Sequence, residues 1–316
     1  MHASKIDGAS AGKPRRRKRR GSYKTQFALY TLIAPVLLLI FIFNYIPMYG
    51  ILISFQDFSP FRGVGGSPWV GFKHIAYFLG DEAFWQVMRN TLIINFYDLL
   101  FGFTAPIVFA LLANELIGSR IKRLVQTISY LPHFLSWIVV SGFFYQMLSP
   151  TEGIVNAVLG WFQIEPQYFM VNKEWFRAIL VSSGIWKEVG WSAILYFAVI
   201  AGIDSSLYEA TMIDGAGRFR QMLHVTLPGM LPMIILLLLL KLSTIFAIGF
   251  ERIFVMQNPL VLDVSDVIST YVYRVGLLGS QYSLTTAIGF IQSILGFVLL
   301  VSANRLSKRL VGMGLY

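Results

Sequence analysis

The chain has 316 residues, of which 56% are hydrophobic, 15% aromatic and only 13% charged, with a formal net charge of +10. Soluble domains carry a charged share of roughly one quarter, so this composition excludes an ordinary soluble protein and indicates a polytopic membrane protein. The sequence contains no cysteine, which excludes disulfides, thiol chemistry and cysteine-ligated metal sites.

Residues 1–26 form a polar tail that contains the basic run P-R-R-R-K-R-R, Pro14–Arg20. Such a run can bind nucleic acid, but directly before a long apolar segment it is typical of a topogenic signal, and we interpret the tail as a cytoplasmic anchor. The preceding G-A-S-A-G-K resembles a phosphate-binding loop only in part, because three residues separate its glycines where four are required. We therefore predict no nucleotide site in this tail.

The remainder of the sequence alternates between long apolar segments and shorter polar ones. A bilayer core of about 30 Å requires about 20 apolar residues per helix, and six segments meet that requirement. We therefore predict an all-α membrane domain over residues 27–316. Its transmembrane helices are expected at about 27–55, 91–113, 128–148, 176–201, 230–256 and 282–303.

Lysine and arginine are distributed unevenly between the polar segments. Of the 26 in the chain, 17 lie in the tail, in residues 114–127, in residues 202–229 and at the C-terminus, whereas seven lie in the alternate segments or at the helix ends beside them. By the positive-inside rule, both termini and the 202–229 segment are predicted to be cytoplasmic. Residues 56–90, 149–175 and 257–281 are then predicted to face outward.

The polar stretch 204–228 is patterned like a small folded module. Ser206 and Glu209 have the spacing of a capping box, so a short helix is expected to begin at Ser206. The Asp214-Gly215 dipeptide predicts a turn that ends this helix. A second short helix is expected after the turn, and Pro228 suits the first turn of the apolar helix that follows.

The spacing within this stretch resembles the EAA loop of bacterial ABC importer permeases, although an ordinary amphipathic loop is the alternative interpretation. The pattern is E-A, three residues, D-G-A and then V-x-L-P, with nine residues between Gly215 and Val225. Thr211 replaces the second alanine of the motif. The positions that match the motif are Glu209, Ala210, Gly215, Val225, Leu227 and Pro228.

This resemblance implies a type I ABC importer permease fold with six transmembrane helices, in which the loop forms cytoplasmic coupling helices that dock on an ATPase subunit. It implies that the chain itself binds no cofactor, because ATP and Mg would be bound by the partner ATPase. The implied partners are a second homologous permease, two ABC ATPase subunits and an extracytoplasmic solute-binding protein that lands on the outward segments, with no nucleic acid. On this basis, the residues expected to couple to the ATPase are Glu209, Ala210, Asp214, Gly215, Ala216 and Arg218.

Three further motifs are similar to the carbohydrate permeases of the LplB type, which are related to importers of oligosaccharides rich in uronic acids, such as aldouronates, pectin fragments or alginate. They are R-N-T-L at Arg89–Leu92, Y-L-P-H-F-L-S-W at Tyr130–Trp137 and I-W-K-E-V-G-W at Ile185–Trp191. The similarity implies import of an oligosaccharide into a bacterial cell across its cytoplasmic membrane. A neutral sugar is the alternative to a uronate-containing one.

Ionisable residues inside membrane spans cost about 2.5–3.5 kcal/mol each near the helix centre, so they normally face a polar path or a partner. In one interpretation Lys187 contacts a substrate hydroxyl or carboxylate while a nearby tryptophan stacks on sugar rings. In the other, Lys187 forms an interhelical ion pair, for example with Asp98. Lys241 and Asp98 are expected to be structural more than functional. The substrate-path candidates are Lys187, Glu188, Trp186, Trp191 and Asp98.

The sequence contains no nucleophile elbow, metal-ligand cluster or H-E-x-x-H motif, so we predict no enzymatic site and no metal site. Two rival hypotheses remain. An ion-gradient-driven secondary transporter is disfavoured by the capped polar loop and by the lack of paired broken helices. A membrane-embedded enzyme is disfavoured by the absence of a convergent catalytic cluster, whereas an assembly scaffold would be favoured by a pull-down that recovered no ATPase.

Overall fold

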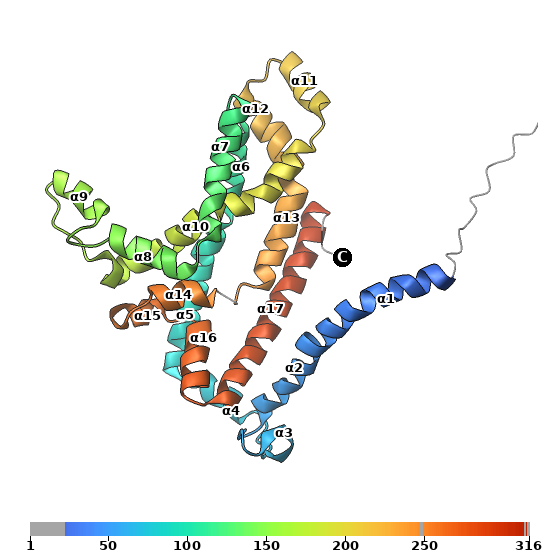
Figure 1. Ribbon diagram of the computed structural model, residues 1–316, viewed down its shortest axis with the longest axis vertical. Coiled ribbons are helices and arrows are strands. Elements are labelled where there is room, and N and C mark those ends of the chain that lie inside the picture. Colours follow the sequence, from blue (N-terminus) through green and yellow to red (C-terminus); the bar gives the residue numbers. More distant parts are fainter. Residues whose placement is uncertain (1–22, 247–248, 313, 315–316) are drawn as a thin grey trace, which may run out of the picture. The chain divides into compact units, whose positions relative to one another are not determined.

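The computed structural model describes residues 23–246, 249–312 and 314. These residues are predominantly helical, and in place of strands they contain one isolated bridge between Gln56 and Trp69 (Figure 1). The chain divides into two compact units, Met1–Gly50 and Ile51–Tyr316. The basic run predicted to anchor the N-terminus lies outside the described residues.

The described part of the first unit is a long apolar helix. It consists of α1 (Tyr23–Ile40), a π-helical turn at Phe41–Tyr45 and α2 (Ile46–Met48). A 3-10 helix, Tyr49–Phe55, continues it into the second unit. Residues Leu29–Phe55 are long and apolar enough to cross a membrane, which agrees with the first predicted span.

Four further candidate spans belong to the second unit, Glu82–Asn114, Lys173–Ala201, Arg218–Ser243 and Tyr282–Arg309. The first joins α5 (Glu82–Tyr97) to α6 (Thr104–Asn114) through a π-helical turn at Asp98–Gly102, and the second is α10 (Lys173–Ala201). The third joins α12 (Arg218–Gln221), a π-helical turn at Met222–Thr226 and α13 (Leu227–Ser243). The fourth lies in α17 (Tyr282–Val311). An all-α membrane fold is therefore confirmed.

The third predicted span, 128–148, is not one straight helix. It is replaced by α7 (Ser119–Tyr130), a 3-10 turn at Leu131–Phe134 and α8 (Trp137–Met147), and the two parts are bent by 104°. Pro132 has no backbone N–H to continue α7. The hydroxyl of Ser136 accepts from the N–H of Val139 and so caps a new helix.

The fifth predicted span, 230–256, is also wrong at its C-terminal end. The long helix stops at Ser243, and Phe250–Met256 form the separate helix α14. The hydroxyls of Ser243 and Thr244 donate to the carbonyls of Leu240 and Lys241, which competes with continuation of the helical hydrogen-bond ladder.

Helix α10 is the central element of the second unit and packs against α6, α7, α13 and α14. Its N-terminus is capped by Asn172, whose side chain accepts from the N–H of Glu174. At Gly190 a Cβ atom would overlap the backbone carbonyl of Ser129, so only glycine allows α7 to approach this closely. The core on α10 includes Ile179, Leu180, Ala193, Tyr196 and Ile200.

The polar stretch folds as α11 (Ser205–Ile213), which a turn at residues 214–217 joins to the α12–α13 helix. The predicted capping box is wrong, because Asp204 caps α11 by accepting from the N–H of Ser206. Gly215 adopts a φ of 75°, which confirms the predicted turn. Pro228 lies in the first turn of α13 as expected, but the helix runs from Arg218 without the predicted separation.

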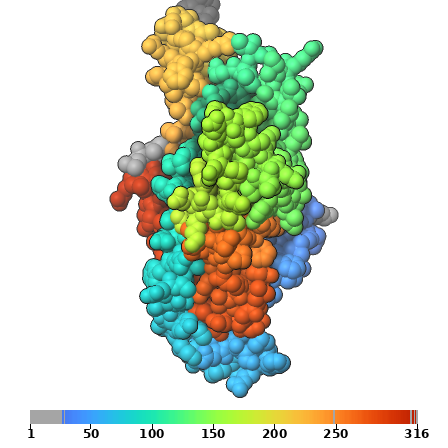
Figure 2. All heavy atoms as spheres, turned by 90° about the vertical axis from the view of Figure 1, so that its left-hand side faces the viewer, coloured from blue at the N-terminus to red at the C-terminus, as the bar shows by residue number. Residues whose placement is uncertain are grey.

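The other end of the second unit is built from short helices. They are α3 (Gly63–Gly66), α4 (Lys73–Leu79) and α16 (Ile268–Val272), whereas α15 (Leu262–Ser265) lies at the height of α14 and α9 (Ile154–Trp161) protrudes to one side (Figure 1). Figures 1 and 2 show α11 and α3 at opposite ends of this unit.

Two lysines pair with carboxylates that lie outside the candidate spans. Lys73 donates to Asp57 and Lys173 to Asp263, and these hydrogen bonds hold the pKa of each carboxyl below its usual value.

Candidate functional site

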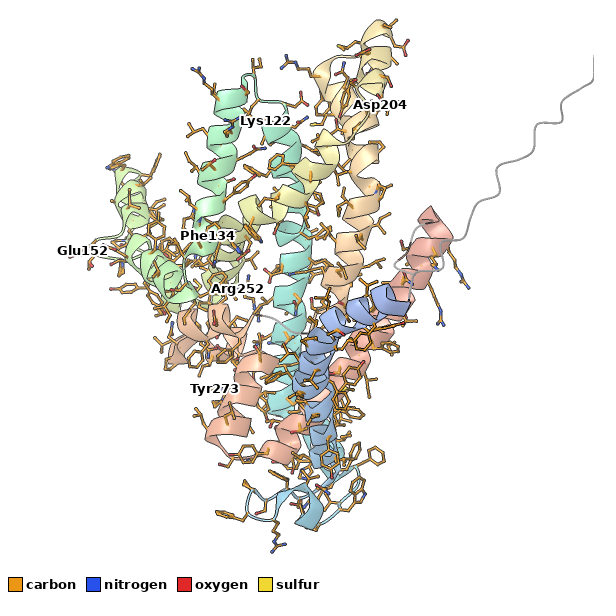
Figure 3. All side chains as sticks on the ribbon, turned by 45° about the vertical axis from the view of Figure 1, so that its right-hand side comes forward. Lys122, Phe134, Glu152, Asp204, Arg252 and Tyr273 are labelled. Atoms are coloured by element: carbon orange, nitrogen blue, oxygen red, sulfur yellow. The ribbon has the colours of Figure 1, made fainter. Side chains whose placement is uncertain are left out.

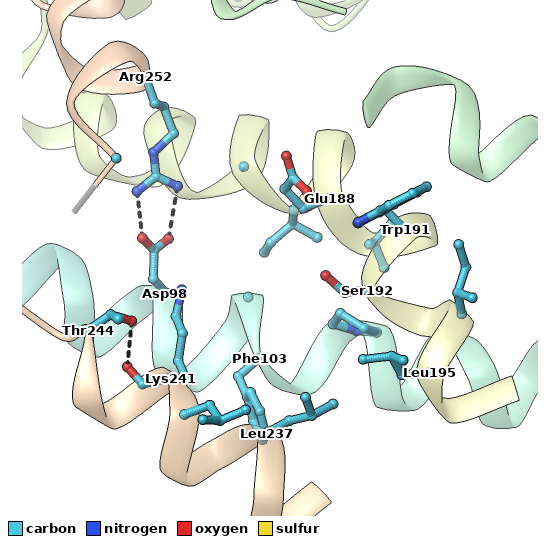
Figure 4. Close-up of a pocket in the computed structure, with 18 of the residues that line it drawn as sticks. Asp98, Phe103, Glu188, Trp191, Ser192, Leu195, Leu237, Lys241, Thr244 and Arg252 are labelled. Carbon is cyan, nitrogen blue, oxygen red and sulfur yellow. Dashed lines mark hydrogen bonds and ion pairs between the residues drawn. The ribbon is translucent and has the colours of Figure 1, made fainter. Parts of the chain in front are cut away.

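A cavity of about 770 Å³ opens among α5, α6, α10, α13 and α14 (Figure 4). Figure 3 shows one of its residues, Arg252, partway between Asp204 at the α11 end of the unit and Tyr273 towards the other end. The wall is mainly apolar, with aromatic side chains that include Phe103, Trp137 and Trp191. An apolar cavity with a few fixed polar groups is the usual form of a small-molecule site.

An ion pair between Asp98 and Arg252 crosses one side of the cavity. The carboxylate accepts two hydrogen bonds, of 3.2 Å from Nη1 and 2.5 Å from Nη2 of Arg252. Both side chains are largely buried. A Cβ at Gly184 would overlap the guanidinium, so this glycine gives Arg252 its room. The suggested pair between Asp98 and Lys187 is therefore wrong, because the partner of Asp98 is Arg252.

Lys187 lies behind the cavity wall and is buried. Its ammonium donates to the backbone carbonyl of His133 at 2.5 Å and lies 5.5 Å from the ring centroid of Trp137. The neighbouring Glu188 lines the cavity, and its carboxylate lies 2.8 Å from Nδ1 of His133 and 3.6 Å from the Lys187 ammonium. These contacts tie α10 to the break between α7 and α8.

The two candidate tryptophans have different surroundings. Trp191 lines the cavity and stacks flat on the ring of His133, with centroids 4.3 Å apart. Trp186 instead stacks on Phe143, with centroids 5.5 Å apart, and is not among the lining residues. Of the five substrate-path candidates, Asp98, Glu188 and Trp191 thus share the cavity, whereas Lys187 and Trp186 do not line it.

Sequence reasoning missed three contributors to this site. Arg252 and His133 were not among the predicted substrate-path residues, although Arg252 lies in a largely apolar run, F-E-R-I-F, which is a signal for a buried partner. Lys241 was expected to be structural, yet it lines the cavity. Arg252 was missed because the helix breaks after α13, and this break brings α14 back against α10.

The predicted coupling residues form an exposed surface at the α11 end. Glu209, Ala210, Asp214, Gly215 and Arg218 are exposed and Ala216 is half-buried. The hydroxyls of Tyr208 and Thr226 lie 3.0 Å apart and fasten α11 to the base of α13. The backbone N–H of Ser206 lowers the pKa of the capping Asp204 carboxyl.

Apolar side chains project from the same end, namely Leu207, Met212, Ile213 and Phe219. Ile213 is 87% exposed, and several exposed apolar side chains at one end are typical of a surface that contacts a protein partner. Within the described residues, no group of three histidine or acidic side chains could hold a metal ion.

Three comparisons relate this chain to known proteins. Residues 102–312 match the family described as binding-protein-dependent transport system inner membrane component. The chain is 38% identical, over 99% of its length and 98% of the relative, to the polygalacturonan/rhamnogalacturonan transport system permease protein YteP of Bacillus subtilis (strain 168). It is 41% identical to protein LplB of the same organism, over 91% of each chain.

Comparison with solved structures also relates this chain to subunits of bacterial ABC transporters. The fold matches a chain of a bacterial ABC transporter involved in the import of the acidic polysaccharide alginate, with a TM-score of 0.84 and 39% identity. That match covers 91% of this chain and 97% of the other. The alginate transporter in complex with an alginate pentasaccharide-bound periplasmic protein matches with a TM-score of 0.85 and 38% identity.

Proposed function

The chain belongs to the family of binding-protein-dependent transport system inner membrane components, and from this premise we propose that it is the permease subunit of an ATP-driven oligosaccharide importer. Its place is the bacterial cytoplasmic membrane. The observation that carries the proposal is the fold match to the alginate importer over 91% of the chain. The cavity among the helices supplies a few charged groups, Asp98, Glu188, Lys241 and Arg252, within a mainly apolar wall.

The substrate class follows from the two kinds of relative. YteP is described as transporting polygalacturonan and rhamnogalacturonan, and the matched crystal structures concern alginate, so both point to oligosaccharides that contain uronic acids. The cavity suits such a substrate, because its aromatic wall can cover sugar rings while its charged groups meet carboxylates or hydroxyls. We propose a uronate-containing oligosaccharide.

The remaining machinery is proposed to lie in partner chains. These are a second permease, two ATPase subunits that bind ATP and Mg, and a solute-binding protein on the outer side. The exposed α11 surface, with Ile213 and Phe219 beside Glu209, supports docking of an ATPase there. The excess of lysine and arginine in the segments on that side supports a cytoplasmic position for it and for both termini.

Substitutions in the coupling loop test this assignment. Gly215→Val introduces strain at a left-handed position, and Glu209→Lys reverses a charge on the docking surface. We expect each variant to insert and assemble but to lose about tenfold or more of its sugar uptake per ATP hydrolysed, because α11 no longer follows the ATPase. Reconstituted vesicles that report both rates measure this ratio.

Gly312→Val is the matched control. Gly312 has a φ of 71° and open space around its Cβ position, like Gly215, but it follows α17 and lies outside the coupling loop. We expect its ratio of uptake to hydrolysis to equal that of the parent protein. Unchanged ratios in both coupling-loop variants would remove α11 from the coupling role, and uptake driven by an ion gradient without ATPase would favour a secondary transporter.

A further inference from the structure

The cavity contains one charge that the described residues leave uncompensated, and that charge is positive. Its charged lining residues are Asp98, Glu188, Lys241 and Arg252. Asp98 and Arg252 neutralise each other through two hydrogen bonds. Glu188 is held by His133 and lies close to the ammonium of Lys187. Among the described residues, the Lys241 ammonium has no hydrogen-bond, ion-pair or aromatic partner.

Lys241 stands at the end of a strongly apolar helix. It is in the last turn of α13, directly after the run L-L-L-L-L, and is exposed. The hydroxyl of Thr244 donates to the backbone carbonyl of Lys241, so this contact does not involve the Lys241 ammonium. A charged side chain in a membrane span normally faces a polar path or a partner, so an unpaired amine here requires an anion or water.

The geometry points to Lys241 as the residue that binds a uronate carboxylate during passage, and we propose that it selects acidic over neutral oligosaccharides. This inference rests on the proposed function. Arg252 is less suited to the task, because a substrate carboxylate would first have to displace Asp98 from its two hydrogen bonds. A lysine is a compact charge on a flexible stem, which suits a ligand that must be captured and then released.

The opposite side of the cavity is suited to the sugar rings. In the view of Figure 4, Lys241 is drawn on the side of Asp98 and Arg252, and Glu188, Trp191 and Ser192 on the other. Trp191 is 44% exposed and offers an apolar surface, and the Ser192 hydroxyl also lines the cavity. A sugar that placed its carboxylate on Lys241 would therefore meet aromatic and hydroxyl groups across the cavity.

The absence of cysteine from the sequence makes a charge-restoration experiment possible. In Lys241→Cys, 2-aminoethyl methanethiosulfonate reacts with the thiol to form a mixed disulfide, releases methanesulfinate and restores an ammonium close to its original position. The 2-hydroxyethyl and 2-sulfonatoethyl reagents instead install a neutral group and an anion by the same reaction. The probes are trigalacturonate and its methyl-esterified form, and ATP-driven uptake by the full reconstituted complex is measured.

We expect Lys241→Cys to lower the kcat/KM for trigalacturonate by about tenfold or more, as truncation of one partner of a close charge pair does. Only the aminoethyl reagent is expected to restore uptake, and the ester is expected to be insensitive to all three. Lys122→Cys is the control, because the Lys122 ammonium bonds Asn114 away from the cavity. The same reagents on the parent complex control for cysteines in the partner subunits.

Three results would overturn the proposal. One is restoration by the neutral reagent, and another is an equal effect on the acid and its ester. The third is loss of the second permease from the purified Lys241→Cys complex with recovery on aminoethylation, because Lys241 would then pair with that subunit. Failure of the parent complex to take up either probe with ATP would contradict the proposed function instead, which keeps the two claims separate.

Discussion

At the scale of single residues, we expect the stability of the second unit to depend strongly on the buried ion pair between Asp98 and Arg252. Removing either partner leaves a buried charge without compensation, which costs about 3–5 kcal/mol, whereas removing both charges costs much less. We therefore expect Asp98→Asn and Arg252→Gln each to lower the thermal stability of the purified protein strongly. The double variant is expected to be more stable than either single variant.

A double-mutant cycle on the unfolding temperature measures this coupling. Leu237→Gln supplies a control, because Leu237 lines the same cavity and the variant adds a polar group without breaking an ion pair. Additive losses in the double variant would show that the two side chains do not stabilise each other.

The chemistry of individual residues was predicted from sequence only in part. Asp98, Glu188 and Trp191 were found because charges and tryptophans stand out within apolar segments, and the structure brings all three to one cavity. Their partners were not found. Arg252 is 154 positions from Asp98 and His133 is 55 from Glu188, and a single sequence holds no signal for pairing over such distances.

At the scale of helices, the close contact between α7 and α10 depends on Gly190. A methyl group there would overlap the Ser129 backbone, which cannot move without shifting α7. We expect Gly190→Ala to lose about 1–3 kcal/mol of stability from overpacking. Because this contact lies beside the cavity wall, we expect sugar uptake by the Gly190→Ala variant to fall as well.

Gly142→Ala is the matched control for this contact. Gly142 is an exposed helical residue in α8 with nothing within 4 Å of its Cβ position. Helix propensity alone favours alanine at such a site, so stability is expected to stay level or to rise slightly. The unfolding temperatures of Gly190→Ala and Gly142→Ala, measured under the same conditions, test this expectation. An equal change in unfolding temperature for the two variants would contradict close packing at Gly190.

The helices themselves were largely predictable, and their interruptions were not. Apolar length identified the spans, because twenty apolar residues have few alternatives to a membrane helix. The 104° bend after α7 and the stop at Ser243 depend on local competition by Pro132, Ser136 and Thr244 within runs that remain apolar. Hydropathy does not register such competition, so both segments were predicted as continuous spans.

At the scale of the whole molecule, two ends of the second unit serve different proposed partners. The α11 end carries the motif that resembles the EAA loop and exposes the apolar side chains on which we propose that an ATPase docks. The α3 end holds residues of the 56–90 segment, which is predicted to face outward, and there Lys73 pairs with Asp57. The cavity lies between them, where motion at one end could open or close a path to the other.

The role of the chain in ATP-driven import is tested most directly by uptake of trigalacturonate into vesicles that contain this chain with its second permease and two ATPase subunits, with the loaded solute-binding protein outside and ATP inside. We expect uptake that requires hydrolysable ATP and the binding protein and that continues when proton and sodium gradients are abolished. Uptake that persists without ATP and collapses with an ion gradient would contradict it.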